Sequence, residues 1–395
     1  MSYKRVYLSP KKEESLKRFH PWIFSGAIHH TDSPLEEGEI VDVFDSNNNF
    51  LATGHCQIGS IAVRVLTFQK EKIDAEFWKK RFETAYNLRR QLGLTNNHNT
   101  NVYRLIHGEG DCLSGLIVDI YGNTAVIQAH SPGMHIARQE ITAALAELSG
   151  NFIKNIYYKS EGTLPYKAEL DPEDGYLFGG TDVSDYVLEN GLKFKVDWVK
   201  GQKTGFFVDQ RNNRDLLEKY SENRKVLNLF CYTGGFSAYA MRGNAGLVHS
   251  VDSSSKAIDL TKVNIDMNFP GDNRHHAFTE DVFLYLEKTN QQYDLMILDP
   301  PAFAKHRKVL RNALQGYKKL NALAFEKIQP NGIIFTFSCS QVVNKDDFRL
   351  AVFSAAAQSK RNVKILHQLT QQPDHPINIY HPEGEYIKGF ILSVD

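Results

Sequence analysis

The sequence KVLNLFCYTGGF at residues 225–236 has the pattern that decides the fold: an apolar, strand-like run that ends in two glycines. A helical stretch follows, and then a second apolar run, LVHSVD, at 247–252. The same alternation continues through YDLMILDP at 293–300, GIIFTFSCS at 332–340 and YIKGFILSV at 386–394. Such runs, separated by amphipathic helices, predict an α/β fold with a parallel, doubly wound sheet that binds ligands beyond the carboxyl ends of its strands.

The region before this alternation has a different character. A chain of 395 residues is long enough for two or three cores. Short alternating strands at 38–68 predict a small β-rich module, and helical spacing of apolar residues at 74–92 predicts a helix after it. Strand patterns at 115–130, a helical pattern at 136–148 and an Asn190-Gly191 hairpin signal follow. We therefore expect a β-rich domain at 1–72, a middle α+β domain at 73–196 and the α/β domain at 197–395.

Composition limits the partners of the chain. The 46 basic and 46 acidic residues cancel, so a nucleic-acid partner needs a local basic surface. The four cysteines form no Cys-x-x-Cys pair, so no metal is expected. The N-terminus lacks the apolar core of a secretory signal, and no apolar run reaches membrane-spanning length, which predicts a cytoplasmic protein with no membrane partner.

The first two strand ends indicate a nucleoside cofactor. Tyr232, Thr233, Gly234 and Gly235 form a turn whose glycines let the backbone approach a ligand, and Asp252 closes the next strand, where a carboxylate commonly binds ribose hydroxyls. A plain turn with a capping Asp is the alternative. The glycine spacing does not match a pyrophosphate-binding loop, which favours S-adenosylmethionine, a cofactor without phosphate, over a dinucleotide.

Two further strand ends complete the expected site. Asp281 follows the third strand, where it can meet the adenine amino group, cap the next helix, or do both. The fourth strand ends in Asp299-Pro300-Pro301, where the prolines hold the chain extended, followed by Ala302 and Phe303. Asp299 can hydrogen-bond a base and Phe303 can stack on one, although a purely structural Pro-Pro turn remains the alternative.

Cys339 follows the fifth strand, next to the expected Asp-Pro-Pro site. Carbon 5 of a pyrimidine is too weakly nucleophilic to attack a methyl sulfonium unaided, and a thiolate that adds at carbon 6 overcomes this. We therefore expect Cys339 to be the nucleophile rather than a packing cysteine, with nearby positive charge or a helix dipole favouring its thiolate. Cys231, in the glycine turn, is assigned to packing.

Basic residues suggest where RNA would bind. One run, between Pro300 and Phe325, contains Lys305, Arg307, Lys308, Arg311, Lys318 and Lys319 and no acidic residue. A second set lies near the N-terminal aromatics Phe19, Trp22 and Phe24: Lys4, Arg5, Lys11, Lys12, Lys17 and Arg18. Solvated helix faces are the alternative interpretation of such runs.

Together these motifs resemble the bacterial ribosomal RNA 5-methylcytosine methyltransferases that combine an N-terminal PUA domain with a Rossmann-like catalytic domain. The resemblance covers essentially the whole chain and rests on RFHPWIFSGAI (18–28), KTGFFVDQR (203–211), NLFCYTGGF (228–236), LDPPAF (298–303), GYKKLN (316–321), TFSCS (336–340) and DHP (374–376). It implies a PUA-like domain that binds RNA, a middle domain, and a class I methyltransferase domain that methylates cytosine in large-subunit (23S) ribosomal RNA.

The resemblance also assigns residues. It implies that Asp209, Arg211, Tyr232, Asp252 and Asp281 line the cofactor site and that Cys339 is the nucleophile. We assign Asp299 to catalysis and to the cofactor site together, and Pro300, Pro301 and Phe303 to the substrate. One position departs from the family, because Ala302 stands where a Lys often follows the two prolines.

These residues predict a reaction and leave rivals open. Cys339 would add to carbon 6 of a cytosine held by Asp299, carbon 5 would take the methyl group, and loss of the carbon 5 proton, with no base assigned, would release the thiolate. The rivals are methylation of an exocyclic amine of adenine (N6) or guanine (N2), a non-catalytic RNA-binding assembly factor, and a nicotinamide dehydrogenase. The oligomeric state is left open, with a homodimer as one option.

Overall fold

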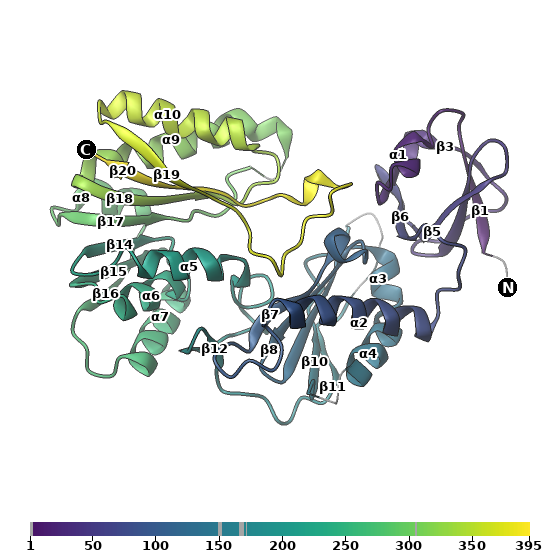
Figure 1. The fold of residues 1–395 in the computed structure, drawn as a ribbon, viewed down its shortest axis with the longest axis horizontal. Helices are drawn as coiled ribbons and strands as arrows, with labels where there is room; N and C mark the ends of the chain where they lie inside the picture. Colours follow the sequence, from purple (N-terminus) through teal and green to yellow (C-terminus); the bar gives the residue numbers. More distant parts are fainter. Residues whose placement is uncertain (1–2, 149–151, 166–169, 171, 305) are drawn as a thin grey trace. The chain divides into compact units, whose positions relative to one another are not determined.

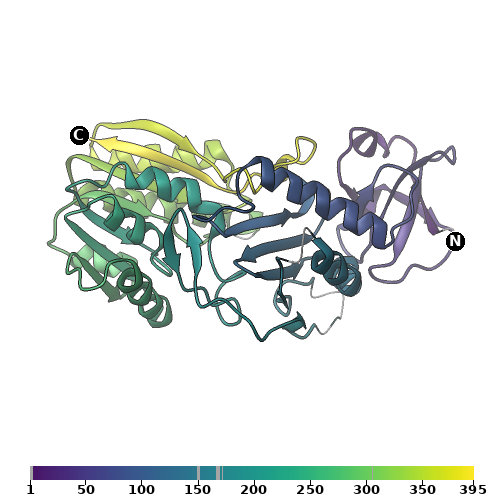
Figure 2. The ribbon, with the colours of Figure 1, turned by 60° about the horizontal axis from the view of Figure 1, so that its bottom comes forward.

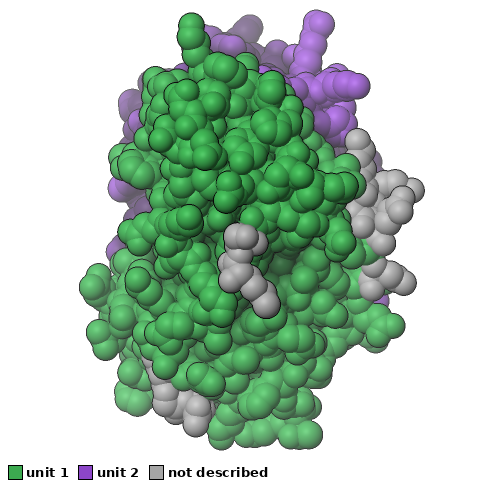
Figure 3. Space-filling model, turned by 90° about the vertical axis from the view of Figure 1, so that its right-hand side faces the viewer, with its two compact units in different colours: residues 1–188, 196–208, 373–384 green, residues 189–195, 209–372, 385–395 purple. Residues whose placement is uncertain are grey.

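The computed structural model describes residues 3–148, 152–165, 170, 172–304 and 306–395. The chain forms two compact units, shown in different colours in Figure 3. The first comprises residues 1–188, 196–208 and 373–384, and the second comprises residues 189–195, 209–372 and 385–395. The three domains with bounds at 72 and 196 stay a prediction. Within the described ranges, no helix is long and apolar enough to cross a membrane.

The N-terminal sheet of the first unit has six strands in the order β2-β6-β5-β4-β1-β3. Its elements are β1 (Lys4–Leu8), α1 (Glu14–Lys17), β2 (Trp22–Phe24), η1 (Ser25–Ala27), β3 (Ile28–Thr31), β4 (Ile40–Phe44), β5 (Phe50–Cys56) and β6 (Ile61–Thr67). Its hydrophobic core contains four fully buried valines: Val6, Val41, Val43 and Val63. The strands expected within 38–68 are confirmed as β4, β5 and β6.

The second sheet of this unit has the order β11-β10-β9-β8-β7. Its elements are α2 (Ala75–Gln91), β7 (Val102–His107), η2 (Gly108–Asp111), β8 (Leu116–Tyr121), β9 (Thr124–Ala129), α3 (Pro132–Ile136), α4 (Arg138–Glu147), β10 (Asn155–Tyr158) and β11 (Gly175–Phe178). The helix expected at 74–92 is confirmed as α2, which begins where the Asp74 carboxylate accepts hydrogen bonds from the amides of Glu76 and Phe77. The predicted hairpin turn lies between β12 (Val187–Glu189) and β13 (Leu192–Phe194), with φ of 48° at Asn190 and 83° at Gly191.

The second unit is built on a seven-stranded sheet in the order β16-β15-β14-β17-β18-β20-β19. Its strands are β14 (Lys225–Leu229), β15 (Leu247–Asp252), β16 (His275–Thr279), β17 (Tyr293–Leu298), β18 (Ile328–Ser338), β19 (Val363–Leu369) and β20 (Lys388–Val394). Its helices are η5 (Val208–Gln210), α5 (Arg211–Glu218), α6 (Gly235–Arg242), α7 (Ser255–Asn268), α8 (Val282–Lys288), η6 (Arg307–Val309), α9 (Leu310–Lys327) and α10 (Lys345–Ser359). The first residue of η5, Val208, still belongs to the first unit. Helices α5 to α7 pack together, as do α8 to α10, in two layers with the sheet between them (Figures 1 and 2).

One strand corrects the expectation of a wholly parallel sheet. Strand β20 pairs antiparallel with both β18 and β19, while the other pairs of this sheet are parallel. A parallel neighbour needs a crossover, usually a helix, to bring the chain back to the starting edge. Between β19 and β20 the structure has only the short helix η7 (Pro382–Gly384), so the chain re-enters the sheet in the opposite direction.

Strand register brings the expected motifs to one edge of this sheet. Leu229 at the end of β14 lies opposite Val251 in β15 and Leu298 in β17, and Leu298 lies opposite Thr336 in β18. The carboxyl ends of β14, β15, β17 and β18 therefore lie together. This edge carries the glycine turn, Asp252, the Asp-Pro-Pro motif and Cys339.

Candidate active site

The glycine turn after β14 has a strained backbone. Phe230, Tyr232 and Gly234 have φ of 57°, 47° and 78°. Positive φ is unfavourable for residues other than glycine and is kept only where the surroundings enforce it. Here the Tyr232 amide donates to the Asp252 carboxylate at 3.0 Å, and a Cβ at Gly234 would lie 2.7 Å from Cγ2 of Thr261.

Helix α7 holds the same turn from behind. The Thr261 hydroxyl donates to the carbonyl of Tyr232 at 2.8 Å, and the Asn264 amide donates to the carbonyl of Thr233 at 2.9 Å. Cys231 is buried, and burial raises the pKa of its thiol, which fits the packing role expected for it. A rigid glycine turn beside a strand-end carboxylate fits a nucleoside cofactor such as S-adenosylmethionine.

The two acidic residues at the next strand ends have backbone partners. Asp252 accepts from the amides of Tyr232 and Ser254, each through a different carboxylate oxygen. Asp281 is exposed and caps α8, where its Oδ1 accepts from the amides of Phe283 and Leu284 at 2.9 and 3.0 Å. The capping role of Asp281 is thus confirmed, and the contacts of Asp252 with ribose and of Asp281 with adenine stay predictions.

The segment before α5 lies beside the last strand of the sheet. Asp209 is 5% exposed and accepts a hydrogen bond from the Tyr386 hydroxyl at 2.8 Å. Arg211 is buried in the first turn of α5. Their cofactor roles stay predictions, and Tyr386 is a partner of Asp209 that sequence reasoning missed.

Gln210, between these two residues, reaches the Asp-Pro-Pro motif. Its Nε2 donates to Oδ2 of Asp299 at 3.1 Å, and its Oε1 accepts from Nδ2 of Asn213 at 2.6 Å. The two bonds fix which end of the Gln210 amide faces Asp299. Gln210 and Asn213 therefore orient the Asp299 carboxylate. The only sequence signal for Gln210 was its place inside the KTGFFVDQR motif.

The structure brings Asp299-Pro300-Pro301 and Cys339 together, as the sequence predicts. Strands β17 and β18 are parallel neighbours, and the Cys339 thiol donates to the Pro300 carbonyl at 3.7 Å. Pro300 is buried and Cys339 is half-buried. The hydroxyl of Ser340 donates to the carbonyl of Ala304 at 2.6 Å, which joins the two motifs a second time.

The aromatic residue of the motif packs against α9. The Phe303 ring lies 4.7 Å from the Tyr317 ring, and a Cβ at Gly316 would come within 3.0 Å of it. Tyr317 is fully buried, burial raises the pKa of its phenol to about 12, and its oxygen accepts from the Ser338 hydroxyl at 2.9 Å. Phe303 thus has a packing role, and base stacking on its remaining surface stays a prediction.

The basic run beyond the motif is largely exposed. Arg307 and Lys308 in η6 and Arg311 in α9 are exposed, whereas Lys319 pairs with Glu287 at 3.8 Å. Lys305 lies outside the described residues. The structure thus presents Arg307, Lys308 and Arg311 as cations available to phosphates.

The N-terminal basic set of the first unit divides into paired and exposed side chains. Lys4 bonds to Glu39 at 2.9 Å, and Lys17 bonds to Glu13, the residue directly before α1. Lys11, Lys12 and Arg18 are exposed. Exposed cations, rather than paired ones, are the members of the set that suit phosphate binding.

The aromatic residues of the same region divide in the same way. Phe19 and Phe24 are each 48% exposed, and the Phe19 ring lies 5.3 Å from that of Tyr380. The Trp22 indole instead donates to Glu109 at 2.8 Å and lies beneath the Arg64 guanidinium. Trp22 is therefore held by contacts within the unit, and a contact of its ring with RNA stays a prediction.

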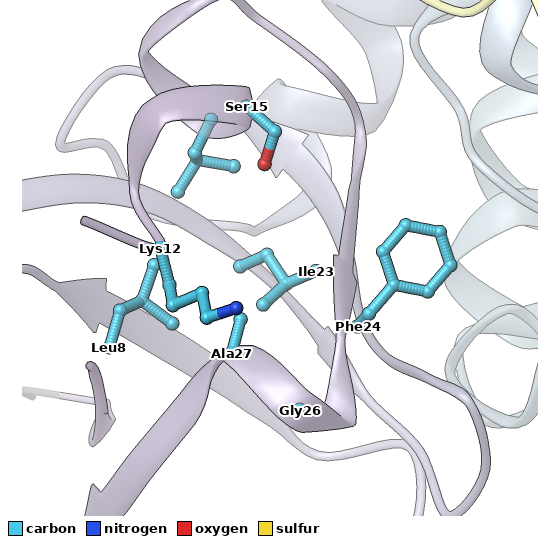
Figure 4. A pocket seen from close by; sticks show the side chains of 8 residues that line it. Leu8, Lys12, Ser15, Ile23, Phe24, Gly26 and Ala27 are labelled. Atoms are coloured by element: carbon cyan, nitrogen blue, oxygen red, sulfur yellow. The ribbon is translucent and has the colours of Figure 1, made fainter. Parts of the chain in front are cut away.

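A pocket of about 290 Å³ lies beside these residues. Its lining is mainly apolar, with one lysine and one serine: Leu8, Lys12, Ser15, Leu16, Ile23, Phe24, Gly26 and Ala27. In Figure 4, Lys12 and Phe24 lie on opposite sides of the Ile23 side chain. Within the described ranges, no group of three or more His, Cys, Asp or Glu side chains could hold a metal ion.

Comparison with known proteins defines the class. Residues 160–379 match the model of S-adenosylmethionine-dependent methyltransferases, and residues 6–68 match that of PUA-like domains. A putative S-adenosylmethionine-dependent methyltransferase from Streptococcus mutans shares the fold, with a TM-score of 0.84, 24% identity and 100% coverage of both chains. Fold and site are therefore those of a methyltransferase that uses S-adenosylmethionine, with an N-terminal PUA-like β domain.

Two relatives narrow the family. The protein named "Ribosomal RNA large subunit methyltransferase I" from Tolumonas auensis is 39% identical over 98% of both chains. The protein of the same name from Alteromonas mediterranea is 38% identical over 99% of this chain and 98% of its own. The chain belongs to the ribosomal RNA large subunit methyltransferase I family.

Proposed function

We propose that the protein methylates carbon 5 of a cytosine in large-subunit ribosomal RNA and that Cys339 is its nucleophile. The observation that carries the proposal is the half-buried Cys339 thiol, 3.7 Å from the carbonyl of Pro300 in the Asp-Pro-Pro motif. The names of the relatives support ribosomal RNA as the substrate. Cytoplasmic localisation stays a prediction beside it.

The residues have distinct tasks in this reaction. When bound, S-adenosylmethionine supplies an electrophilic methyl group on its sulfonium, and the glycine turn with Asp252 would hold its nucleoside. Asp299, oriented by Gln210, accepts a hydrogen bond from the exocyclic amine of the cytosine. Pro300 and Pro301 keep the backbone beside the base rigid.

The thiolate of Cys339 adds to carbon 6 of the cytosine, and the electron pair of the 5,6 double bond moves to make carbon 5 a nucleophile. After carbon 5 has been methylated, its proton leaves to a base and the returning electron pair expels the thiolate. This restores the double bond and frees Cys339.

The first test compares Cys339→Ala with Cys112→Ala, which removes an exposed cysteine far from the site in sequence. Both variants are incubated with large-subunit ribosomal RNA and labelled S-adenosylmethionine, and the modified nucleoside is identified by mass spectrometry. We expect 5-methylcytosine from the wild type and from Cys112→Ala, and a loss of more than a hundredfold in Cys339→Ala. Full methylation by Cys339→Ala would refute the covalent mechanism.

The same analysis separates the nearest rival. Methylation of an exocyclic nitrogen of adenine or guanine needs no thiol, and Asp-Pro-Pro followed by an aromatic also suits that chemistry. A product methylated on nitrogen, with Cys339→Ala active, would establish the amine methyltransferase instead.

A second test traps the adduct. In RNA that contains 5-fluorocytidine, the fluorine at carbon 5 cannot leave as a proton does, so the thioether at carbon 6 should persist. We expect a denaturation-resistant protein–RNA adduct with the wild type and with Cys112→Ala but not with Cys339→Ala. An equal yield of adduct from Cys339→Ala would assign the nucleophile to another side chain.

A further inference from the structure

The start of β20 carries a buried lysine next to the proposed nucleophile. Lys388 is 4% exposed. Its ammonium donates to the carbonyl of Ser340 at 2.9 Å and to the carbonyl of Tyr386 at 3.2 Å. Lys388 also lies opposite Ser338 in the pairing of β18 with β20. Its two neighbours in β18 and the following loop, Ser338 and Ser340, are therefore the residues on either side of Cys339 in the sequence.

A buried ammonium with carbonyl partners is unusual, since a lysine is rarely buried unless it is paired. Burial lowers the pKa of Lys388, while the negative charges of Glu385 and of the Cys339 thiolate oppose that change. The burial of this charge therefore costs stability, and the two carbonyl partners offset part of that cost.

Among the described residues, a phenol and two carboxylates also contribute to the electrostatics around Cys339 and Lys388. Tyr317, from α9, is neutral because burial raises the pKa of its phenol to about 12. Asp299, directly after β17, interacts electrostatically with Tyr317, and Glu385, in the segment before β20, does so with Lys388. Negative charge disfavours a thiolate, and a cation at this place opposes that effect.

We propose that Lys388 is a positioning residue for the reaction: it anchors the loop after β18 through the Ser340 carbonyl and stabilises the thiolate of Cys339 with its charge. The inference rests on the proposed role of Cys339 as nucleophile. It adds a group that favours the thiolate, for which the sequence offered no local signal, because Lys388 lies about fifty residues from Cys339 in the chain.

The test measures the thiol directly, without RNA. Wild type, Lys388→Met, Lys388→Arg and Lys364→Met are treated with iodoacetamide from pH 6 to 10, and alkylation of Cys339 is followed by peptide mass spectrometry. Lys364 is a matched control, since it is an exposed lysine on the neighbouring strand β19 that bonds to Asp395. The exposed Cys112 serves as the reference thiol in every sample.

We expect the pH at which half of Cys339 reacts to rise by about one unit in Lys388→Met, which is about a tenfold loss of thiolate at neutral pH. Lys388→Arg should shift it less, and Lys364→Met and Cys112 should not shift. The kcat of Lys388→Met should fall about tenfold at pH 7.5 and recover as the pH rises, with the KM for S-adenosylmethionine unchanged. An unaltered alkylation profile in Lys388→Met would overturn the proposal.

Two further outcomes are informative. If Lys388→Met does not fold, Lys388→Gln replaces it, because the amide can still donate to the two carbonyls but carries no charge. If Cys339→Ala methylates RNA normally while the alkylation shift is present, the nucleophile role is refuted and the effect of Lys388 on the thiolate stands. The two proposals therefore fail separately.

Discussion

Replacement of Gln210 by Glu tests whether the orientation of Asp299 matters for the reaction. The Gln210 amide donates to Asp299 at 3.1 Å and is itself held by Asn213 at 2.6 Å. Glu has nearly the same shape, but it removes the donor and places a second carboxylate at that distance. The perturbation is thus electrostatic and local.

The magnitude follows from the distance. Two unit charges 3.1 Å apart repel by about 5 kcal/mol at an effective dielectric constant of about 20. Asp299 is half-buried, so water screens part of this repulsion. The lost hydrogen bond to a charged group is by itself worth about 1.5–3 kcal/mol, so we expect kcat/KM to fall roughly 10- to 100-fold at pH 7.

The pH dependence has a definite sign. Two adjacent carboxylates share a proton, and the pair binds it more tightly than either carboxyl would alone. The proton leaves as the pH rises, which removes the donor to Asp299 and leaves two carboxylates that repel each other. The activity of Gln210→Glu relative to the wild type should therefore be highest near pH 6 and fall towards pH 9.

The assay is methylation of RNA by labelled S-adenosylmethionine at several pH values, with cofactor affinity measured by calorimetry. Asn212→Asp is the matched control, because it adds the same charge two residues further along the chain, on the exposed side of α5. We expect this control to keep wild-type kinetics. Equal kcat/KM for Gln210→Glu and the wild type across this pH range would refute the positioning role of Gln210.

Four other outcomes are expected. Gly234→Ala, at φ of 78°, should lower cofactor affinity in calorimetry and stability by about 1–3 kcal/mol in urea unfolding. Glu189→Gln, which removes the carboxylate charge that pairs with the buried guanidinium of Arg214, should cost about 3–5 kcal/mol in the same assay. Burial lowers the pKa of His55 to about 4. The free energy of unfolding should therefore fall as the pH drops from 6.5 to 4, because the imidazole takes up a proton in the unfolded chain first. In His55→Gln, the midpoint of urea unfolding should depend less on pH over this range. Lys12→Glu should weaken RNA binding and reduce its salt slope by about one or more.

The sequence predicted where the candidate motifs lie because each follows a strand, and a local pattern fixes both the strand and its end. Gly234 and Gly235 and the two prolines after Asp299 restrict or free the backbone at their own positions. Their effect can therefore be predicted from the local sequence alone. The same holds for the Asn190-Gly191 turn and for Asp281 as a helix cap. The prediction of a parallel strand was wrong for β20. The direction of a strand depends on the connection that precedes it, and an apolar run in the sequence carries no information about direction.

Side-chain partners from distant segments could not be predicted in this way. Tyr386 and Lys388 acquire their partners because the chain returns to the sheet after β19. Gln210 meets Asp299, which lies 89 residues away in the chain, and Trp22 meets Glu109, which lies 87 residues away. Sequence alone thus determined which chemical groups stand at the strand ends. Only the tertiary structure decided which buried charges and donors face them, because burial and hydrogen bonding depend on residues far apart in the chain.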